Sequence, residues 1–285
     1  MSQWLRTFRS AVAGIQRSRR RHSAWSQSTA YLGDYIALTR LHTGHKIYVD
    51  TRDIGIASHL MMDGRWEPWV ERVLVKALKP GMTFCDIGAN FGYYTLIGAS
   101  AVGARGRVFA FECNPRLFDL LNRSVLVNGL HEIVELSPLA VSGGMEQATL
   151  TYDNKFSGGG TILEAGPDSS ETHNKITVGC ASLDSLLSLQ TSPNVLKVDV
   201  EGSEPLVFEG AHRILSDRRL QTIIFEYYAP SISRSISPTA LLNQLSGHDF
   251  HLQMLPPTGL LPPCGPEELV EAIGDKMVYV LATRP

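Results

Sequence analysis

The stretch Phe84-Cys-Asp-Ile-Gly-Ala-Asn-Phe-Gly-Tyr-Tyr-Thr95 decides how the rest of the chain is interpreted. A short apolar run typical of a buried strand leads into a turn with Gly88 and Gly92, and a helical pattern follows. Glycine lets the backbone bend tightly and approach a ligand closely, and free N–H groups at a helix start favour a carboxylate or phosphate. The Gly-x-x-x-Gly spacing is not that of a dinucleotide-binding turn or of a P-loop, so both are disfavoured.

Strands and helices alternate from residue 83 onward. The predicted strands are Thr83–Ile87, Val108–Glu112, Ile133–Leu136, Val195–Val200 and Thr222–Tyr227. The predicted helices are Tyr93–Ala101, Arg116–Asn128, Leu183–Leu189, Glu204–Leu215 and Pro238–Ser246. Such alternation is typical of βαβ units on a parallel sheet. Two further strands, His251–Leu255 and Met277–Ala282, close the chain. The sequence therefore predicts an α/β fold with a mostly parallel, seven-stranded sheet, helices on both faces and an antiparallel C-terminal strand.

The residues before this sheet divide into two regions. Residues 1–30 are basic: the first 33 residues hold six arginines and no acid. Such a segment is either a solvated, partly disordered tail or an amphipathic helix that contacts an anionic membrane surface. Residues 31–80, with a strand at His45–Val49 and a helical stripe over Gly64–Leu78, are expected to pack on the core. Residues 81–285 are expected to form the main α/β domain.

The composition is that of an ordinary globular protein. Of 285 residues, 44% are apolar and 19% charged, which excludes a disordered or fibrous chain as a whole. Beyond residue 33, 28 acidic side chains face 20 basic ones, which argues against a nucleic-acid partner. Four scattered cysteines indicate neither a zinc site nor a disulfide framework. With no apolar run of membrane-spanning length and no secretory signal, we expect a cytoplasmic protein.

Acidic residues close four of the predicted parallel strands. They are Asp86, Glu112, Asp199 with Glu201, and Glu226. Open α/β sheets bind ligands beyond the carboxyl ends of their strands, so these acids would form a row beside the glycine turn. Such a row would repel the phosphates of a dinucleotide but suits S-adenosylmethionine, which carries a sulfonium, an ammonium and a ribose diol. Glu112, which lies 24 residues after Gly88, is well placed to hold the diol.

The charged residues in the fourth predicted strand allow two interpretations. Lys197, Asp199 and Glu201 would share one face of that strand. Charges are costly in a central parallel strand unless they are paired or lie at a site. Either Lys197 forms a structural ion pair with a carboxylate, or the carboxylates face the ligand crevice.

Residues 151–180 interrupt the alternation. Gly158-Gly-Gly160 and Gly166-Pro-Asp-Ser-Ser170 indicate a mobile loop. A loop of this length inside a compact domain is usually functional or disordered. Because it leads toward the fourth strand, it is expected to cover a site.

The chain resembles the FkbM family of S-adenosylmethionine-dependent methyltransferases, which have the Rossmann-like class I methyltransferase fold. The similar stretches are Asp53 with Gly64-x-Trp66-Glu67, the turn from Asp86 to Thr95, Phe111-Glu112-x-Asn-Pro115, Asn128, Ala181-Ser-Leu-Asp-Ser185, Lys197-Val-Asp-Val-Glu-Gly-Ser-Glu204, Gly210-Ala211 and Glu226. The similarity runs from about residue 45 to residue 283, and it makes residues 81–285 the methyltransferase domain. The family usually has proline where this chain has Cys113, so packing beside the adenine is expected to differ.

The resemblance implies methyl transfer to a hydroxyl group of a sugar, a glycan or a polyketide-type natural product. The cofactor-binding residues that it implies by position are Glu67, Asp86, Gly88, Ala89, Asn90, Gly92, Glu112, Cys113, Asn114 and Ala140. The glycine turn would line the methionine part, Glu112 would hold the ribose, and Cys113 and Asn114 would flank the adenine.

The acceptor hydroxyl must also lose its proton, and the base candidates are Asp199 and Glu201, with Glu226 behind them. A carboxylate is a weak base unless it is desolvated or coupled to another acid, and this cluster provides both conditions. The same three carboxylates also suit Mg²⁺ or Mn²⁺. Two alternatives stay open: a nitrogen or carboxyl acceptor, and a non-catalytic protein that uses the fold to bind a partner. The intact glycine turn and Glu112 argue against the second.

Overall fold

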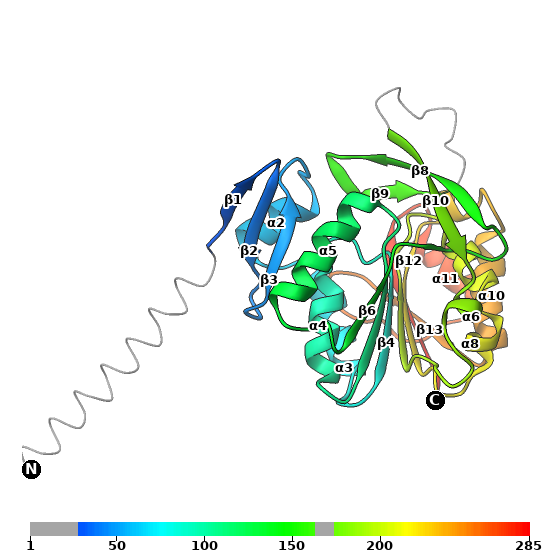
Figure 1. The fold of residues 1–285 in the computed structure, drawn as a ribbon. Helices are drawn as coiled ribbons and strands as arrows, with labels where there is room; N and C mark the ends of the chain where they lie inside the picture. The colour runs from blue at the N-terminus through cyan, green and yellow to red at the C-terminus, as the bar shows by residue number, and fades with distance from the viewer. Residues whose placement is uncertain (1–27, 163–173) are drawn as a thin grey trace, which may run out of the picture.

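A seven-stranded sheet forms the centre of the computed structural model, which describes residues 28–162 and 174–285 (Figure 1). The strands lie side by side in the order β13-β14-β12-β11-β4-β5-β6, so the last strand of the chain, β14, lies between β13 and β12. β14 runs antiparallel to both neighbours, and the other adjacent strands are parallel. In chain order the strands are β4 (Thr83–Ile87), β5 (Arg107–Phe111), β6 (Val134–Ser137), β11 (Val195–Val198), β12 (Thr222–Tyr227), β13 (His251–Leu255) and β14 (Val278–Thr283). The predicted fold class is confirmed.

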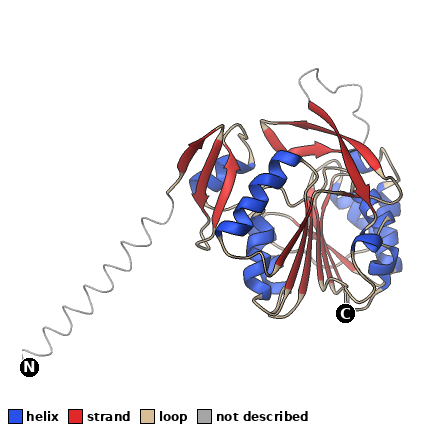
Figure 2. Cartoon of the chain, viewed as in Figure 1, coloured by secondary structure: helices blue, strands red, loops and turns tan. Residues whose placement is uncertain are grey.

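Helices cover both faces of this sheet (Figure 2). One layer consists of α3 (Pro68–Ala77), α4 (Tyr93–Val102) and α5 (Pro115–Val127). The other layer contains α6 (Leu183–Leu186), α7 (Glu204–Glu209), α8 (His212–Ser216), α10 (Pro238–Gly247) and α11 (Pro266–Ile273), and α9 (Ala229–Ile232) follows β12. Each layer packs its own apolar cluster against the sheet. Because β11 and β12 are thereby covered on both sides, all their residues are buried.

The start of α5 is fixed by its own sequence. Pro115 occupies the first turn, where its missing N–H costs no hydrogen bond. The Asn114 side chain accepts hydrogen bonds from the N–H groups of Arg116 at 3.0 Å and Leu117 at 3.4 Å. This N-cap places Asn114 directly after β5, where the ligand crevice of an open α/β sheet lies.

An antiparallel sheet precedes the central one. It consists of β1 (Ala30–Gly33), β2 (Ile36–Arg40) and β3 (Lys46–Asp50), and α2 (Ile56–Asp63) follows it. The buried Asp50 carboxylate joins this sheet to α5, because Oδ2 accepts hydrogen bonds from Arg52 at 2.6 Å and from Arg116 Nε at 2.6 Å. The charge-assisted contact with Arg116 therefore holds the N-terminal sheet against α5, whereas Arg52 braces Asp50 from within its own segment.

The prediction of a mobile loop over residues 151–180 is wrong for the described part. β7 (Ala140–Val141), β8 (Gln147–Asp153), β9 (Phe156–Thr161) and β10 (Asn174–Ala181) form a further sheet in the order β7-β10-β8-β9. The glycines 158–160 lie in β9, which is one of the two edge strands. A Cβ atom on Gly158 would make ordinary contacts of 3.4 Å with the side chains of Glu201 and Ile56, so this strand packs against both the end of β11 and α2. The Gly166–Ser170 stretch lies outside the described residues.

The single helix predicted over Glu204–Leu215 is also wrong, because α7 ends and α8 begins anew around Gly210. A Cβ atom on Gly210 would lie 2.6 Å from the Ser142 carbonyl oxygen, so only glycine lets this turn pack so closely. The Asp184 carboxylate then accepts hydrogen bonds from the N–H groups of Arg213 at 2.7 Å and Ile214 at 3.1 Å. These bonds satisfy the free amides of a new helix start.

Residues 1–27 lie outside the described residues, so the interpretation of the basic segment 1–30 stays a prediction. Within residues 28–162 and 174–285, no helix combines the length and apolar character needed to cross a membrane.

Gly88 tests the packing between the glycine turn and the end of β11. Its φ is +78°, and a Cβ atom there would lie 1.9 Å from the Asp199 carbonyl oxygen. Gly81 is a matched control, since its φ is +88° but a Cβ atom would meet nothing within 4 Å. Either alanine costs about 1–3 kcal/mol for its backbone conformation. We expect Gly88→Ala to lose at least roughly 2 kcal/mol more than Gly81→Ala in urea unfolding, because of the clash. Equal losses would contradict the packing.

Candidate functional site

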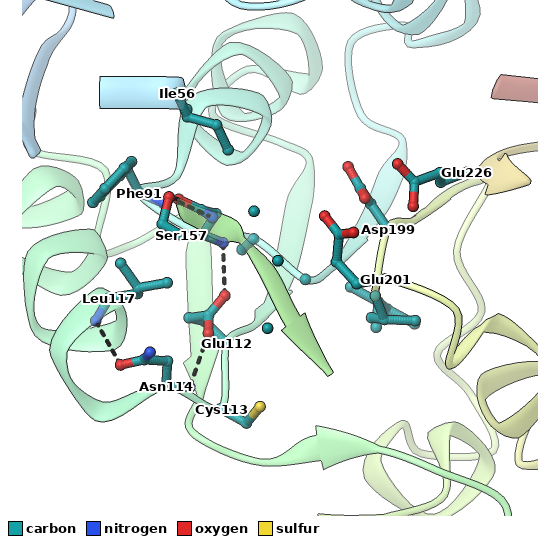
Figure 3. A pocket seen from close by; sticks show the side chains of 18 of the residues that line it. Ile56, Phe91, Glu112, Cys113, Asn114, Leu117, Ser157, Asp199, Glu201 and Glu226 are labelled. Carbon is teal, nitrogen blue, oxygen red and sulfur yellow. Dashed lines mark hydrogen bonds between the residues drawn. The ribbon is translucent and has the colours of Figure 1, made fainter. Parts of the chain in front are cut away.

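A cavity of about 520 Å³ lies beyond the carboxyl ends of β4, β5 and β11, with β9 on its opposite side (Figure 3). Its volume is in the range of small-ligand sites. The predicted site residues that line it are Glu67, Gly88, Ala89, Asn90, Glu112, Cys113, Asn114, Ala140, Asp199, Glu201 and Glu226. The structure thus brings together residues that are spread over much of the chain.

Glu112 anchors the glycine turn at one end of the cavity. Its Oε2 accepts a hydrogen bond from the Asn90 N–H and its Oε1 from the Asn114 N–H, both at 2.8 Å. Burial raises the pKa of Glu112 to about 7, although the two N–H bonds oppose this shift. The carboxylate therefore has a fixed orientation and still has lone pairs for a ligand hydroxyl.

An apolar slot adjoins Glu112. Cys113, Ala140 and Leu150 line the cavity there and belong to one apolar cluster. The Cys113 thiol is free, and burial raises its pKa, so the thiol behaves as a small apolar group. The slot suits a flat apolar ring beside a polar group that Glu112 would hold.

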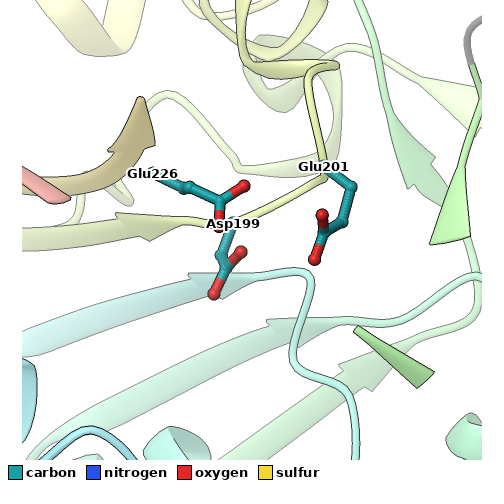
Figure 4. Close-up of side chains that lie close together, drawn as sticks. All are labelled: Asp199, Glu201 and Glu226. Carbon is teal, nitrogen blue, oxygen red and sulfur yellow. The ribbon is translucent and has the colours of Figure 1, made fainter. Parts of the chain in front are cut away.

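Three carboxylates meet at the other end of the cavity (Figure 4). Asp199 and Glu201 follow β11 and Glu226 lies in β12, and each offers an oxygen within 4.8 Å of the others. Burial raises the pKa of Glu201 and Glu226, and the nearby Asp199 carboxylate raises both further. This group of Asp199, Glu201 and Glu226 is called the acid cluster below.

Lys197 and Tyr279 hold Asp199 in place. The Lys197 Nζ atom lies 2.9 Å from Asp199 Oδ2, and the Tyr279 hydroxyl donates to the same oxygen at 2.6 Å. Both interpretations of the fourth strand thus apply together: Lys197 forms a buried ion pair, and the carboxylates still line the cavity.

Glu67 adds a further acid close to this cluster. It precedes α3 with a left-handed φ of 41°, and its Oε2 accepts a hydrogen bond from the Tyr94 hydroxyl at 2.9 Å. Burial raises the pKa of Glu67 to about 7, with a further contribution from Asp199. The Lys197 ammonium, which lies over the Tyr94 ring 4.6 Å from its centroid, opposes this rise in the pKa of Glu67.

Asp86 and Gly92 do not line the cavity, although both are in the predicted set. Asp86 is fully buried in β4, where its Oδ2 accepts a hydrogen bond from the Thr95 hydroxyl at 2.6 Å. Gly92 lies against α5, since a Cβ atom there would be 2.4 Å from Leu121 Cδ1. Both residues shape the turn from behind, and direct cofactor contact stays a prediction for them.

Asp53 fixes β9 across the cavity, a role that the sequence did not indicate. Its Oδ1 accepts a hydrogen bond from the Ala57 N–H of α2 at 2.8 Å, and its Oδ2 from the Ser157 N–H of β9 at 2.6 Å. The Ile54 N–H also donates to the Lys155 carbonyl at 3.0 Å. The Asn90 side chain reaches the Ser157 hydroxyl at 3.3 Å, so the strand is tied to the glycine turn as well.

Sequence reasoning missed Asp53, Ser157 and Tyr279 as site residues. Asp53 belongs to a stretch that resembles the family, which was a usable signal. Ser157 lies in the segment taken for a loop, and Tyr279 stands in an apolar strand without a motif. Only the fold brings these two to the cavity.

The strand order, the single antiparallel strand β14 and the cavity beyond the parallel strand ends are those of the class I methyltransferase fold. A sequence model described as the Methyltransferase FkbM domain matches residues 86–255, more than half of the chain. The chain belongs to the FkbM family of S-adenosylmethionine-dependent methyltransferases.

The hexuronic acid methyltransferase AglP of Haloferax volcanii is 29% identical over 169 residues, which are 59% of this chain and 64% of that protein. This chain thus aligns with less than two thirds of its relative. An S-adenosylmethionine-dependent O-methyltransferase from Thermotoga maritima superposes with a TM-score of 0.42 and 15% identity, covering 87% of this chain and 77% of that one. Fibrillarin of Aeropyrum pernix, solved with S-adenosyl-L-methionine, gives 0.44 and 13%, covering 90% and 99%. Both scores are low, so the family assignment rests on the sequence match.

Replacing Asp53 by alanine tests how β9 is held. The variant loses the acceptor for the Ser157 N–H, and a buried donor without a partner costs about 1–3 kcal/mol. We expect faster amide hydrogen exchange in residues 154–161 and unchanged exchange in the central sheet. Asp63→Ala is the control. Asp63 is the last residue of α2, the helix whose first turn binds Asp53, and its side chain is 66% exposed. Unchanged exchange of β9 in Asp53→Ala would show that other contacts hold the strand.

Proposed function

We propose that the protein transfers a methyl group from S-adenosylmethionine to a hydroxyl oxygen of a sugar or another polyhydroxylated small molecule. The observation that carries this proposal is one cavity with the Glu112 carboxylate at one end and the acid cluster at the other. Family membership supports the methyl transfer, and the geometry supports the finer assignment of an oxygen acceptor.

The side chains around the cavity fit S-adenosylmethionine by their chemistry. Glu112 offers a carboxylate with a fixed orientation to the ribose hydroxyls. The slot beside Cys113 and Ala140 suits the adenine ring. Among the described residues, six acidic side chains and one basic side chain, Lys197, line the cavity, and their carboxyl oxygens favour a sulfonium and an ammonium group.

When bound, S-adenosylmethionine supplies its sulfonium methyl group, which the acceptor oxygen takes as the carbon–sulfur bond breaks. The protein must hold the acceptor in line with that bond, and such positioning is worth roughly 7–11 kcal/mol of the barrier. A carboxylate of the acid cluster receives the hydroxyl proton and passes it to solvent. Lys197 and Tyr279 both bind Asp199 Oδ2, so its other oxygen is the one available to an acceptor.

An uncharged hydroxyl suits this end of the cavity better than a carboxylate acceptor does. The acid cluster and Glu67 would repel a second anion at the reacting position. The name of the Haloferax relative supports an acceptor of the sugar type. A panel of neutral sugars and uronic acids, incubated with a methyl donor that carries a tritium-labelled methyl group, tests this. We expect neutral sugars to be labelled. Labelling of carboxyl groups alone would overturn the proposal that the acceptor is a hydroxyl.

Glu112→Gln tests the ribose assignment. The variant loses charge-assisted hydrogen bonds, so we expect S-adenosylmethionine to bind roughly 10–100-fold more weakly in calorimetry. Because the pKa of Glu112 is raised to about 7, its carboxylate forms as the pH rises through that value. Wild-type affinity should therefore weaken about tenfold from pH 8 to pH 6, and this dependence should be smaller in the variant. Glu135→Gln, at an exposed position on β6, is the control. Unchanged affinity in Glu112→Gln would refute the assignment.

Asp199→Asn and Glu201→Gln test the role of the acid cluster. Both should retain S-adenosylmethionine binding, because the ribose end of the cavity is unchanged. Methyl transfer should fall roughly 10²–10⁴-fold, the usual contribution of a general base. Glu268→Gln, an exposed acid on α11, should keep full activity. Full activity in both cluster variants would sink the base proposal.

A further inference from the structure

The acid cluster has the donor set of a cation site. Asp199 and Glu201 come from the end of β11 and Glu226 from β12, and their ligand oxygens lie within 4.8 Å of one another. Oxygen ligands lie roughly 2.0–2.6 Å from Mg²⁺ or Ca²⁺, so ligands on opposite sides of such an ion are about 4–5 Å apart. The three side chains can therefore reach one shared ion.

Glu226 gives the independent reason to expect a ligand. Its side chain lines the cavity although the residue is only 5% exposed. Among the described residues, no hydrogen bond or ion pair reaches its carboxyl group, whereas Glu112 and Asp53 each accept two. A buried carboxyl group without a protein donor is costly, so its orientation into the cavity favours a bound cation as its partner. Figure 4 shows that it points toward the other two carboxylates.

Asp199 is already oriented as a ligand would be. Lys197 and Tyr279 hold its Oδ2, as outer partners orient a metal-binding carboxylate. Lys197 is the basic side chain that lines the cavity in the described part of the chain, and it is engaged with Asp199. No protein cation there is left to face Glu201 and Glu226.

We propose that Asp199, Glu201 and Glu226 bind one hard divalent cation, of the Mg²⁺ or Mn²⁺ class, which holds the acceptor through its oxygens. Carboxylate oxygens select such ions over the softer Zn²⁺ and Cu²⁺. Three protein ligands leave coordination positions for water and for acceptor hydroxyls, and the cation would polarise a hydroxyl that it binds. The assignment of the acceptor rests on the proposed function, but the cation site itself does not.

Mn²⁺ binding to the purified, EDTA-treated full chain tests the site directly. Free Mn²⁺ is measured by electron paramagnetic resonance, and the heat of binding by calorimetry. We expect one saturable site per chain, competition by Mg²⁺, and at least roughly tenfold weaker binding in Glu226→Gln. Glu112→Gln is the matched control, because it removes a buried acid of the same cavity outside the cluster and should bind Mn²⁺ as the wild type does.

Absence of saturable Mn²⁺ binding, or equal binding in Glu226→Gln and wild type, would overturn the cation site. If Glu226→Gln does not fold by circular dichroism, Glu201→Gln takes its place, since Glu201 is less buried. S-adenosylmethionine binding is measured on the same metal-free protein. If the wild-type protein binds S-adenosylmethionine but not Mn²⁺, only the proposed cation site is refuted. If it does not bind S-adenosylmethionine, the proposed function is refuted.

Discussion

The buried Lys197 ammonium is the charge on which the arrangement of the site depends. It lies in a central strand, 1% exposed, with Asp86 beside it in register on β4 and Asp199 within 2.9 Å. Burial alone would lower its pKa, but the Asp199 and Asp86 carboxylates more than offset this and raise it. Removing one partner of such a buried pair leaves an uncompensated charge. The ion pair thus fixes Asp199 at the strand end, where it lines the cavity with the other acids.

Much of the fold could be predicted because its signals are local. The alternation of apolar runs and helical stripes predicted the sheet, with strand ends within two residues of those observed. β9 could not be predicted, because three successive glycines are typical of a loop and this strand is held by its pairing with β8 and by Asp53. Tyr279 reaches the cavity because β14 pairs with the distant β12, which no short stretch of sequence encodes.

The sequence predicted one row of acids at the strand ends, but in the structure one of these acids, Asp86, does not line the cavity. Strand ends place Glu112, Asp199, Glu201 and Glu226 at the cavity. Asp86 precedes the last residue of β4, so its side chain remains within the sheet and binds Thr95. A shift of one or two positions along a strand separates a residue that faces a ligand from one that supports the core.

The walls of the cavity come from segments that precede β4 in the chain and from segments that follow it. Asp53 and Glu67 precede that strand, whereas the glycine turn and the acid cluster follow it. The segment between β3 and β4 therefore belongs to the site: a shortened protein that began at β4 would lack part of the cavity wall and Asp53, which holds β9. For protein engineering, the residues between β3 and β4 that line the cavity are positions at which its shape can be changed while the glycine turn beside Glu112 keeps its sequence.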